Sequence, residues 1–284
     1  MAAVGKGVED VKKRSHINRK YNVFKNVWRI IILIFVLWPI FWGFRTSIMA
    51  NQYENSFFPT EISFNSYKSL LGSKLTWMTF RNSIVSGLGT LAILLPIVIL
   101  GAYALARIQF RGRKLGKIFI YLPLVPSIAL LVNLSTIINK LGLMNHLLAV
   151  ILLNVAFLSP FSLWILRNFM MTISYSLEEA ATLDGCGRIR SLIYVILPSA
   201  APGIITVAVY TFIQSWLNFM FGYATITDEK LMLIPQRVCS FLGMYTADLP
   251  QLCAFSIIAL VPPLLFFIIF QKWFIAGLFG NLSK

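Results

Sequence analysis

The sequence predicts an all-α protein that crosses a membrane several times. Of its 284 residues, 58% are hydrophobic and 12% are charged, whereas soluble domains carry about twice that share of charge. A soluble domain of this composition would have to bury more apolar surface than its volume allows. Six apolar runs are long enough, at roughly 20 residues each, to cross the hydrocarbon core as helices. The expected fold is therefore a polytopic membrane protein with six transmembrane helices.

The predicted spans lie, in chain order, near residues 28–48, 82–106, 117–139, 147–169, 201–222 and 252–274. Prolines stand inside several of them, and membrane helices tolerate proline when neighbouring groups satisfy the freed carbonyls. Residues 1–27 form a basic tail ahead of the first span, and we expect this tail to be retained because no small-residue cleavage site follows the apolar run. Residues 28–284 then form a single six-span domain.

Basic residues predict the orientation of the spans. An even number of spans places both termini on one side. Lys and Arg concentrate on that same side, in the tail, in the turn at 107–117 and in the segment 171–200. The positive-inside rule makes this side, and both termini, cytoplasmic. The formal net charge of +15 therefore indicates topology and contact with membrane lipid. We expect no nucleic-acid partner, because basic and aromatic residues are not interleaved as on a nucleic-acid-binding face.

The sequence favours transport over catalysis. All ten acidic residues lie in loops or tails, so no ionisable group near the membrane midplane indicates ion coupling. Residues 112–117 are one residue short of a phosphate-binding loop, and Ile118 stands where Ser or Thr would bind magnesium. His16 and His146 have no carboxylate or cysteine partner at motif spacing, and the three cysteines lack metal-binding spacing. We expect no catalytic residue, metal or cofactor in this chain, and a separate subunit that hydrolyses ATP.

A polar, helix-forming segment, SLEEAATLDGCGRIRSLIYVILPSAAP, begins at Ser176 between the fourth and fifth spans. Ser176 and Glu179 have the spacing of a capping box, and acidic residues suit the positive end of the helix dipole. Four residues share one face of this helix, where small side chains would let another protein approach closely. They are Leu177, Ala180, Ala181 and Asp184. The alternative is an ordinary amphipathic helix lying in the membrane interface.

The same segment contains signals that end one helix and begin another. Gly185 or Gly187 can adopt the left-handed conformation of a helix C-cap. Apolar residues then recur at helical spacing, which predicts a second helix that Pro198 closes.

The spacing of this segment resembles the signature loop of the integral-membrane permease subunits of bacterial ABC importers. The loop contains Glu-Ala-Ala, three residues, Gly, nine residues, and then a hydrophobic residue, any residue and Leu-Pro. The matching residues here are Glu179-Ala180-Ala181, Gly185, Val195 and Leu197-Pro198.

From about Asn65 onward, the chain is similar to the second permease subunit of carbohydrate importers of the maltose and glycerol-phosphate type. The matching pieces are Asn82-Ser83, Ala102-Tyr103-Ala104-Leu105-Ala106-Arg107, Phe110-Arg111-Gly112, Leu141-Gly142-Leu143, Gln271-Lys272-Trp273-Phe274 and Gly277-Leu278. One departure stands in the fifth span, where many relatives have Trp-Asn, an acidic residue and an aromatic. This chain has Trp216-Leu217-Asn218-Phe219 there.

The resemblance implies a fold, partners and a coupling site. The fold is that of a type I ABC importer permease in the bacterial cytoplasmic membrane. The implied partners are a homologous second permease, two copies of an ATPase and an extracytoplasmic solute-binding protein. The helix in the signature loop would be the coupling helix, lodged in a cleft of the ATPase. Its coupling residues would be Glu178, Glu179, Ala180, Ala181, Asp184 and Gly185.

The fifth span contains a polar stripe with two interpretations. Thr211, Gln214, Ser215 and Asn218, with Gly222 beyond, fall on one side of a helix whose other faces are apolar. They either line a translocation pathway for a hydroxylated solute or form hydrogen bonds between helices, as small polar residues commonly do in membranes.

The long connection between the last two spans, residues 224–251, also has two interpretations. In the maltose-type relative this loop reaches into the binding protein, and here Arg237, Tyr245 and Asp248 would supply polar contacts. Residues 228–230 would form a solvated turn, and the apolar run at 231–234 would face the partner. The alternative is a loop folded back onto the chain's own spans.

Together these observations predict a non-enzymatic permease subunit of an ATP-driven importer for an oligosaccharide or related carbohydrate. An importer of another solute, such as a phosphodiester or a peptide, is the alternative within transport. An uncoupled pore or scaffold would need a ring of charges or carbonyls as a filter, and a membrane-embedded enzyme would need a cluster of His, Asp or Glu.

Overall fold

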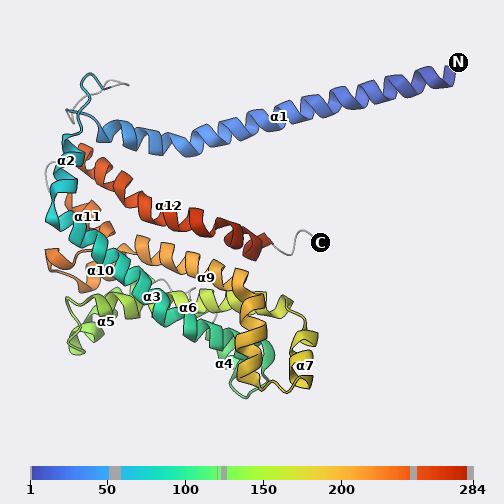
Figure 1. Cartoon of the computed structure of the whole chain (residues 1–284). Helices are drawn as coiled ribbons and strands as arrows, with labels where there is room; N and C mark the ends of the chain where they lie inside the picture. The colour runs from blue at the N-terminus through green and yellow to red at the C-terminus, as the bar shows by residue number, and fades with distance from the viewer. Residues whose placement is uncertain (1, 51–58, 120, 123–126, 244–247, 280–284) are drawn as a thin grey trace. The chain divides into compact units, whose positions relative to one another are not determined.

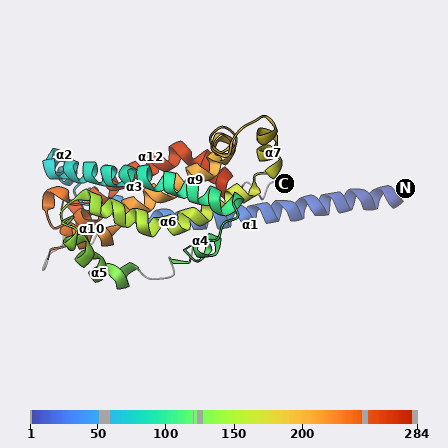
Figure 2. The same cartoon turned by 90° about the horizontal axis from the view of Figure 1, so that it is seen from below.

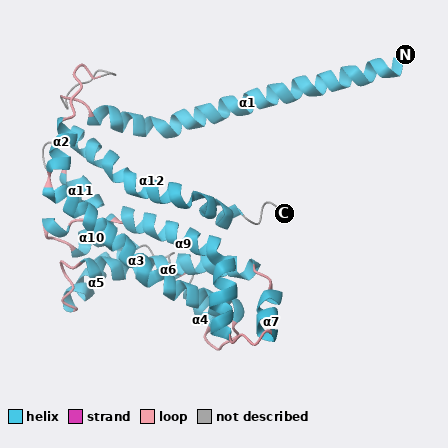
Figure 3. Ribbon diagram, viewed as in Figure 1, coloured by secondary structure: helices cyan, strands magenta, loops and turns pink. Residues whose placement is uncertain are grey.

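The computed structural model describes residues 2–50, 59–119, 121–122, 127–243 and 248–279. As the sequence predicts, these residues are nearly all helical, and the described part of the chain contains no strand beyond an isolated bridge between Met49 and Ile62 (Figure 3). The chain divides into two compact units. The first comprises residues 1–67 and 249–257, and the second comprises 68–248 and 258–284.

Most of the first unit is the helix α1 (Ala2–Ser47). Its second half, Lys25–Ser47, is long and apolar enough to cross a membrane. The predicted tail belongs to this same helix, because residues 8–27 contain neither proline nor glycine to interrupt it. After α1, the hydroxyl of Ser47 lies 2.7 Å from that of Tyr67.

The helices of the central part of the chain follow in order. They are α2 (Asn65–Gly72), α3 (Lys74–Arg107), α4 (Arg113–Phe119), α5 (Ser127–Lys140), α6 (Leu147–Thr172), α7 (Tyr175–Leu183) and α8 (Arg188–Ser191). A π-helical turn, η2 (Leu192–Ile196), leads into α9 (Leu197–Leu217) and α10 (Phe219–Thr225). The chain then continues through the 3₁₀ turn η3 (Glu229–Leu231), α11 (Ile234–Ser240) and α12 (Leu249–Phe279).

The core of the second unit is the bundle of α3, α6 and α9, which run side by side in two views (Figures 1 and 2). Its centre consists of aliphatic side chains from all three helices and from η2. Fully buried examples are Leu94, Val98, Leu166, Ile196 and Val207. Lipid tails are as apolar as these side chains, so the helices are held together by close van der Waals packing and by hydrogen bonds between them.

Five described helices are long and apolar enough to cross a membrane, and they correspond to five of the six predicted spans. They are Lys25–Ser47, Lys74–Arg107, Leu147–Thr172, Arg188–Leu217 and Leu249–Ile275. The third predicted span, 117–139, is not one long helix, because α4 ends at Phe119 and the apolar helix that follows is the shorter Ile128–Lys140. Pro123 and Pro126 stand between them in the sequence and remove two of the backbone donors that a continuous helix needs.

The expectation that Pro198 closes a helix is wrong. Residues Arg188–Leu217 form one continuous helix, in which Pro198 occupies the first turn of α9. The π-helical turn just ahead of it pairs the amide of Leu197 with the carbonyl of Leu192. This wider turn lets the helix pass a residue that has no amide hydrogen of its own.

Candidate functional site

The candidate site centres on α7, at the end of the second unit where α3 finishes and α8 begins (Figure 1). Ser174 is the N-cap, and its hydroxyl accepts a hydrogen bond from the amide of Ser176. The predicted capping box of Ser176 and Glu179 is therefore wrong. The helix begins earlier, at Tyr175, whose side chain is fixed by contacts with the end of α3, so the capping position moves to the residue before it.

The end of α7 confirms the glycine prediction and selects between the two glycines. Gly185 has a φ of +79°, while Gly187 has a φ of −69°. The amide of Cys186 donates to the carbonyl of Ala181 at 2.9 Å, and that of Gly185 donates to Thr182 at 3.0 Å. This pair of bonds is a Schellman motif, which satisfies two carbonyls at the helix end and requires a left-handed residue at Gly185.

The predicted contact face of α7 is only partly correct. Leu177, Ala180 and Asp184 are exposed, but Ala181 is buried, with 7% of its surface accessible. Ala181 therefore packs inside this chain and is not available to a partner subunit. The exposed face includes Glu179 as well as Leu183, which is 89% exposed.

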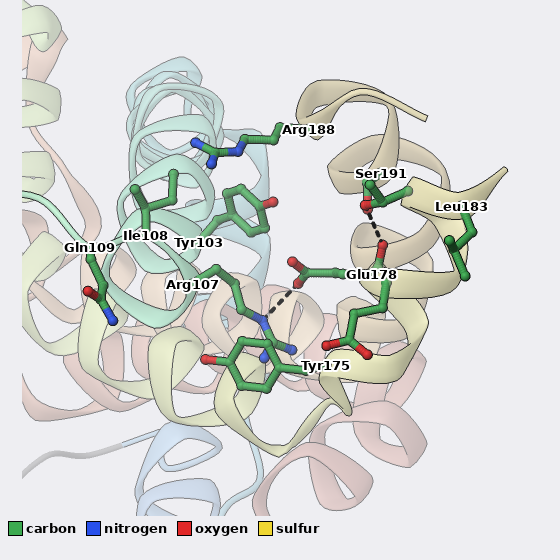
Figure 4. Close-up of a pocket in the computed structure, with 11 residues that line it drawn as sticks. Tyr103, Arg107, Ile108, Gln109, Tyr175, Glu178, Leu183, Arg188 and Ser191 are labelled. Carbon is green, nitrogen blue, oxygen red and sulfur yellow. Dashed lines mark hydrogen bonds and ion pairs between the residues drawn. The ribbon is translucent and has the colours of Figure 1, made fainter. Parts of the chain in front are cut away.

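The two neighbouring glutamates of α7 point in different directions. Glu179 is exposed, whereas Glu178 is 18% exposed and lies against the end of α3. There its Oε1 atom is 2.8 Å from Nε of Arg107, whose side chain is only 2% exposed. Figure 4 shows this ion pair. A buried guanidinium that lacked its partner carboxylate would be costly, so this pair constrains where α7 can lie.

Arg107 makes two further contacts with the segment that leads into α7. Its Nη2 atom donates to the carbonyl of Ile173 at 2.6 Å, and the guanidinium carbon lies 4.0 Å from the ring centroid of Tyr175. The hydroxyl of Tyr175 in turn donates to the carbonyl of Ala106 at 3.2 Å. The last turn of α3 and the first turn of α7 are thus bound to each other in both directions.

Beside this cluster lies a groove of about 770 Å³. Polar side chains that line it come from the end of α3 and from α7 and α8, and they include Tyr103, Gln109, Glu179, Thr182, Arg188 and Ser191 (Figure 4). Acidic and basic groups both contribute, so the groove has no single sign of charge. Among the described residues, no group of three or more His, Cys, Asp or Glu is arranged to hold a metal.

Sequence reasoning missed Arg107, Tyr103 and Tyr175 as parts of this site. Arg107 and Tyr103 belong to a segment that matches the family, and Arg107 to the basic residues that predict the topology, but neither residue is assigned to the coupling site, and Tyr175 is not singled out. The available signal was that the segment ending in Arg107 and the signature loop both match the same family. Two matching segments far apart in sequence are good candidates for contact in space.

Most of the polar stripe of the fifth span joins helices to one another. The hydroxyls of Thr211 and Ser162 are 3.4 Å apart, and Asn154 of α6 donates to Ser215 at 3.0 Å. Asn218 donates to the side-chain oxygen of Asn154 at 3.2 Å. These contacts correspond to the second interpretation, hydrogen bonding between helices, for three of the four residues. Gln214 differs, because its side chain is exposed.

The sequence predicted one continuous helical face from Thr211 to Gly222, and this prediction is wrong. α9 ends at Leu217, and Asn218 has a non-helical ψ of 102°. Its side chain caps the next helix, α10, by accepting from the amide of Phe221 at 3.1 Å. Asparagine favours such capping positions over helix interiors, which explains the break.

The loop 224–251 is folded back onto its own chain in its described part. Asn82 of α3 is fully buried and donates to the carbonyls of Lys230 and Met232. The hydroxyl of Ser83 accepts from the amide of Ile234 at 2.9 Å. Asn145 accepts bonds from Thr227 and from the amide of Asp228. The alternative given for this loop therefore describes its first half.

The expectations for individual loop residues have mixed outcomes. Residues 228–230 are exposed, as expected of a solvated turn. The apolar run was expected to face a partner, but Leu233 and Ile234 are buried, with 2% and 4% exposure. Arg237 packs over the ring of Phe241 at 5.1 Å. Tyr245 lies outside the described residues, and the amide of Asp248 donates to the carbonyl of Phe241.

Comparison with known proteins identifies the class. Residues 97–280 match the family described as binding-protein-dependent transport system inner membrane component, and the chain belongs to this family. It is thus a multi-pass permease component of an importer in the inner membrane.

Two relatives show how far the likeness extends. The chain is 28% identical over 278 residues to the diacetylchitobiose uptake system permease protein DasC of Streptomyces coelicolor, covering 96% of this chain and 99% of that protein. It is 34% identical over 207 residues to the trehalose/maltose transport system permease protein MalG of Thermococcus litoralis, covering 72% and 74%.

A solved structure shows the same fold. A chain of a bacterial ABC transporter involved in the import of the acidic polysaccharide alginate superposes with a TM-score of 0.76 at 22% identity. The superposition covers 90% of this chain and 97% of that one. The fold is accordingly that of an ABC importer permease, as the sequence predicted.

Proposed function

We propose that this chain is one permease subunit of an ATP-driven importer for an oligosaccharide or related carbohydrate. The names of the relatives support the substrate class, because DasC is a permease for diacetylchitobiose uptake and MalG one for trehalose and maltose transport. The expected partners are a second permease, two ATPase subunits and a solute-binding protein outside the membrane. The proposed orientation places both termini and α7 in the cytoplasm.

The observation that carries this proposal is the exposed side of α7. Leu183 is 89% exposed and Leu177 is 44% exposed, while both ends of the helix are capped. An isolated helix of nine residues is unstable in water, so one that is capped, anchored and exposes two leucines beside Glu179 and Asp184 is suited to fit into another protein. We propose that this side enters a cleft of the ATPase, which hydrolyses the ATP that this chain does not bind.

We also propose residues for the translocation pathway and for contact with the solute-binding protein. Of the polar residues in the fifth span, Gln214 is the one whose side chain is exposed, and we assign it to the translocation pathway. The other three polar residues position the pathway indirectly, because they hold α9 and the start of α10 against α6 through hydrogen bonds. They are Thr211, Ser215 and Asn218. Arg237, Tyr245 and Asp248 remain our candidates for contact with the solute-binding protein.

A co-purification experiment tests the α7 contact. Leu183→Arg should reduce recovery of the ATPase with the tagged permease by about tenfold or more, because a charge replaces an apolar side chain at the centre of the contact. Leu141→Arg is the matched control, since Leu141 is 63% exposed at the far end of α5. Equal recovery of the ATPase with both variants would contradict the proposed contact.

An uptake experiment tests the substrate class. The complete complex in proteoliposomes, supplied with the solute-binding protein encoded beside it, should take up a labelled oligosaccharide only when ATP is present on the ATPase side. Uptake of a peptide or phosphodiester in place of every oligosaccharide tried would overturn the substrate class. Uptake without ATP would overturn the energy coupling.

A further inference from the structure

We infer that Arg107, Glu178 and Tyr175 form a joint that makes α7 follow the movement of the end of α3. This inference rests on the proposed function, in which α7 receives movement from the ATPase. Arg107 is accordingly a positioning residue: it touches neither nucleotide nor solute, but it determines where the coupling helix lies. We refer to these three residues as the α3–α7 joint.

The first argument is electrostatic. The side chain of Arg107 is 2% exposed, and its Nε lies 2.8 Å from the Glu178 carboxylate, which is 18% exposed. An arginine stays protonated in proteins, so its charge cannot be removed when its partner moves away. Separating the pair would leave a buried, unpaired charge, which is far more costly than separating an exposed pair. Movement of α3 therefore carries Glu178, and with it α7.

The second argument is geometric. The guanidinium contacts three points of the following segment: the Ile173 carbonyl, the Tyr175 ring and the Glu178 carboxylate. One of these contacts is a directed hydrogen bond, from Nη2 to the Ile173 carbonyl, and the flat guanidinium also lies over the Tyr175 ring. A compact ammonium group would not match this geometry. Arg107 donates from α3 to the segment that leads into α7, and Tyr175 donates from α7 back to the Ala106 carbonyl of α3. Such a set of contacts resists rotation of α7 about its own axis.

The third argument is the division of roles between neighbouring residues. Glu178 faces the joint, while Glu179 and Leu183 face outward. Consecutive helical residues point about 100° apart, so one helix can bind α3 on one side and a partner on another. Arg188 lines the same groove as Arg107 but is exposed. Arg188 is therefore a matched control for Arg107.

The test measures the mobility of α7 in the assembled complex. A spin label is attached at the native Cys186, which directly follows α7 and whose amide donates to Ala181, after Cys239 and Cys253 have been replaced by serine. Arg107→Gln and Glu178→Gln should each increase the mobility of the label, whereas Arg188→Gln should leave it unchanged. Because the pair acts as a unit, the double variant Arg107→Gln/Glu178→Gln should change mobility no more than either single variant.

A second measurement separates coupling from folding. Stimulation of ATPase activity by the loaded solute-binding protein should fall about tenfold or more in Arg107→Gln, since breaking a buried pair frees the helix. Basal ATPase activity and the yield of assembled complex should change by much less. Arg107→Lys keeps the charge but not the planar group, and should give an intermediate result.

The outcomes distinguish this inference from the proposed function. If the unmodified permease does not co-purify with an ATPase, the proposed function fails. If the ATPase is recovered and stimulated normally but the label at position 186 is equally mobile with and without Arg107, only the joint is overturned. Additive effects of the two single variants would also overturn it, because they would show that Arg107 and Glu178 act separately.

Discussion

The segment between α6 and α9 and the loop between α10 and α12 differ in how they treat their apolar residues. Both are long connections between apolar helices, and both contain short helices. In the first, Leu183 and Ile189 are 89% and 74% exposed. In the second, Leu233 and Ile234 are nearly fully buried. The difference comes from polar anchors on the neighbouring helices and not from the hydrophobicity of the segments themselves.

The polar anchors bind different parts of the two segments. Asn82 and Ser83 bind the second segment directly at its apolar run, through the backbone at 230, 232 and 234. Arg107 binds the first segment only at its beginning, up to Glu178. The remainder of α7 therefore stays free on one side. α7 thus presents a surface, and this segment rejoins the core only at Leu192 and Ile196.

The largest expected effect comes from reversing burial within α7. Ala181→Arg should destabilise the chain by about 3–5 kcal/mol, because it introduces an unpaired charge where Ala181 is buried. Ala180→Arg, one residue earlier on the exposed side, should leave the melting temperature of the permease nearly unchanged. Thermal unfolding of the two purified variants in detergent measures this difference, and similar melting temperatures would show that Ala181 is not buried in the protein.

A smaller effect should follow from releasing the second segment. Asn82→Leu removes the donor to the carbonyls of Lys230 and Met232, which should cost about 1–3 kcal/mol. Hydrogen exchange at residues 227–234 should then become faster. Asn139→Leu, at an exposed position on α5, is the control. Unchanged exchange in Asn82→Leu would mean that the loop is held by its apolar contacts alone.

The smallest effect concerns the end of α7. Gly185→Val should cost about 1–2 kcal/mol, because a β-branched residue disfavours the left-handed conformation observed there. No atom lies within 4 Å of an added Cβ at either Gly185 or Gly187, so Gly187→Val isolates the backbone effect. Stimulated ATPase activity and melting temperature should fall only in the Gly185 variant. Equal losses would place the left-handed turn elsewhere.

Much of this architecture could be predicted from local sequence signals. Apolar length was sufficient to locate five spans, and the glycines after an acidic, alanine-rich helix narrowed its C-cap to Gly185 or Gly187, of which Gly185 has the positive φ. The spacing of the signature loop was sufficient to identify the family. These features depend on residues that are close in sequence, where helix periodicity and backbone preference dominate.

The features that could not be predicted depend on partners far away in the chain. Ser174 is the cap because contacts with α3 hold the next residue, Tyr175, at the start of the helix. The Tyr175 hydroxyl donates to the carbonyl of Ala106, which is 69 residues earlier in the sequence. Ala181 faces inward because Glu178 on the same side meets Arg107. Asn218 breaks the fifth span where its side chain can reach both Asn154 and the amide of Phe221. Single-sequence periodicity contains no information on such pairs.

The π-helical turn Leu192–Ile196 fixes the rotational phase between α9 and everything that precedes it. A π-helical turn holds more residues than an α-helical turn. Side chains before and after it are therefore out of step by an amount that α-helical spacing does not predict. Adding one residue within α8 would turn the chain that precedes it by about 100° about the helix axis and direct Glu178 away from Arg107, even if every side chain were retained.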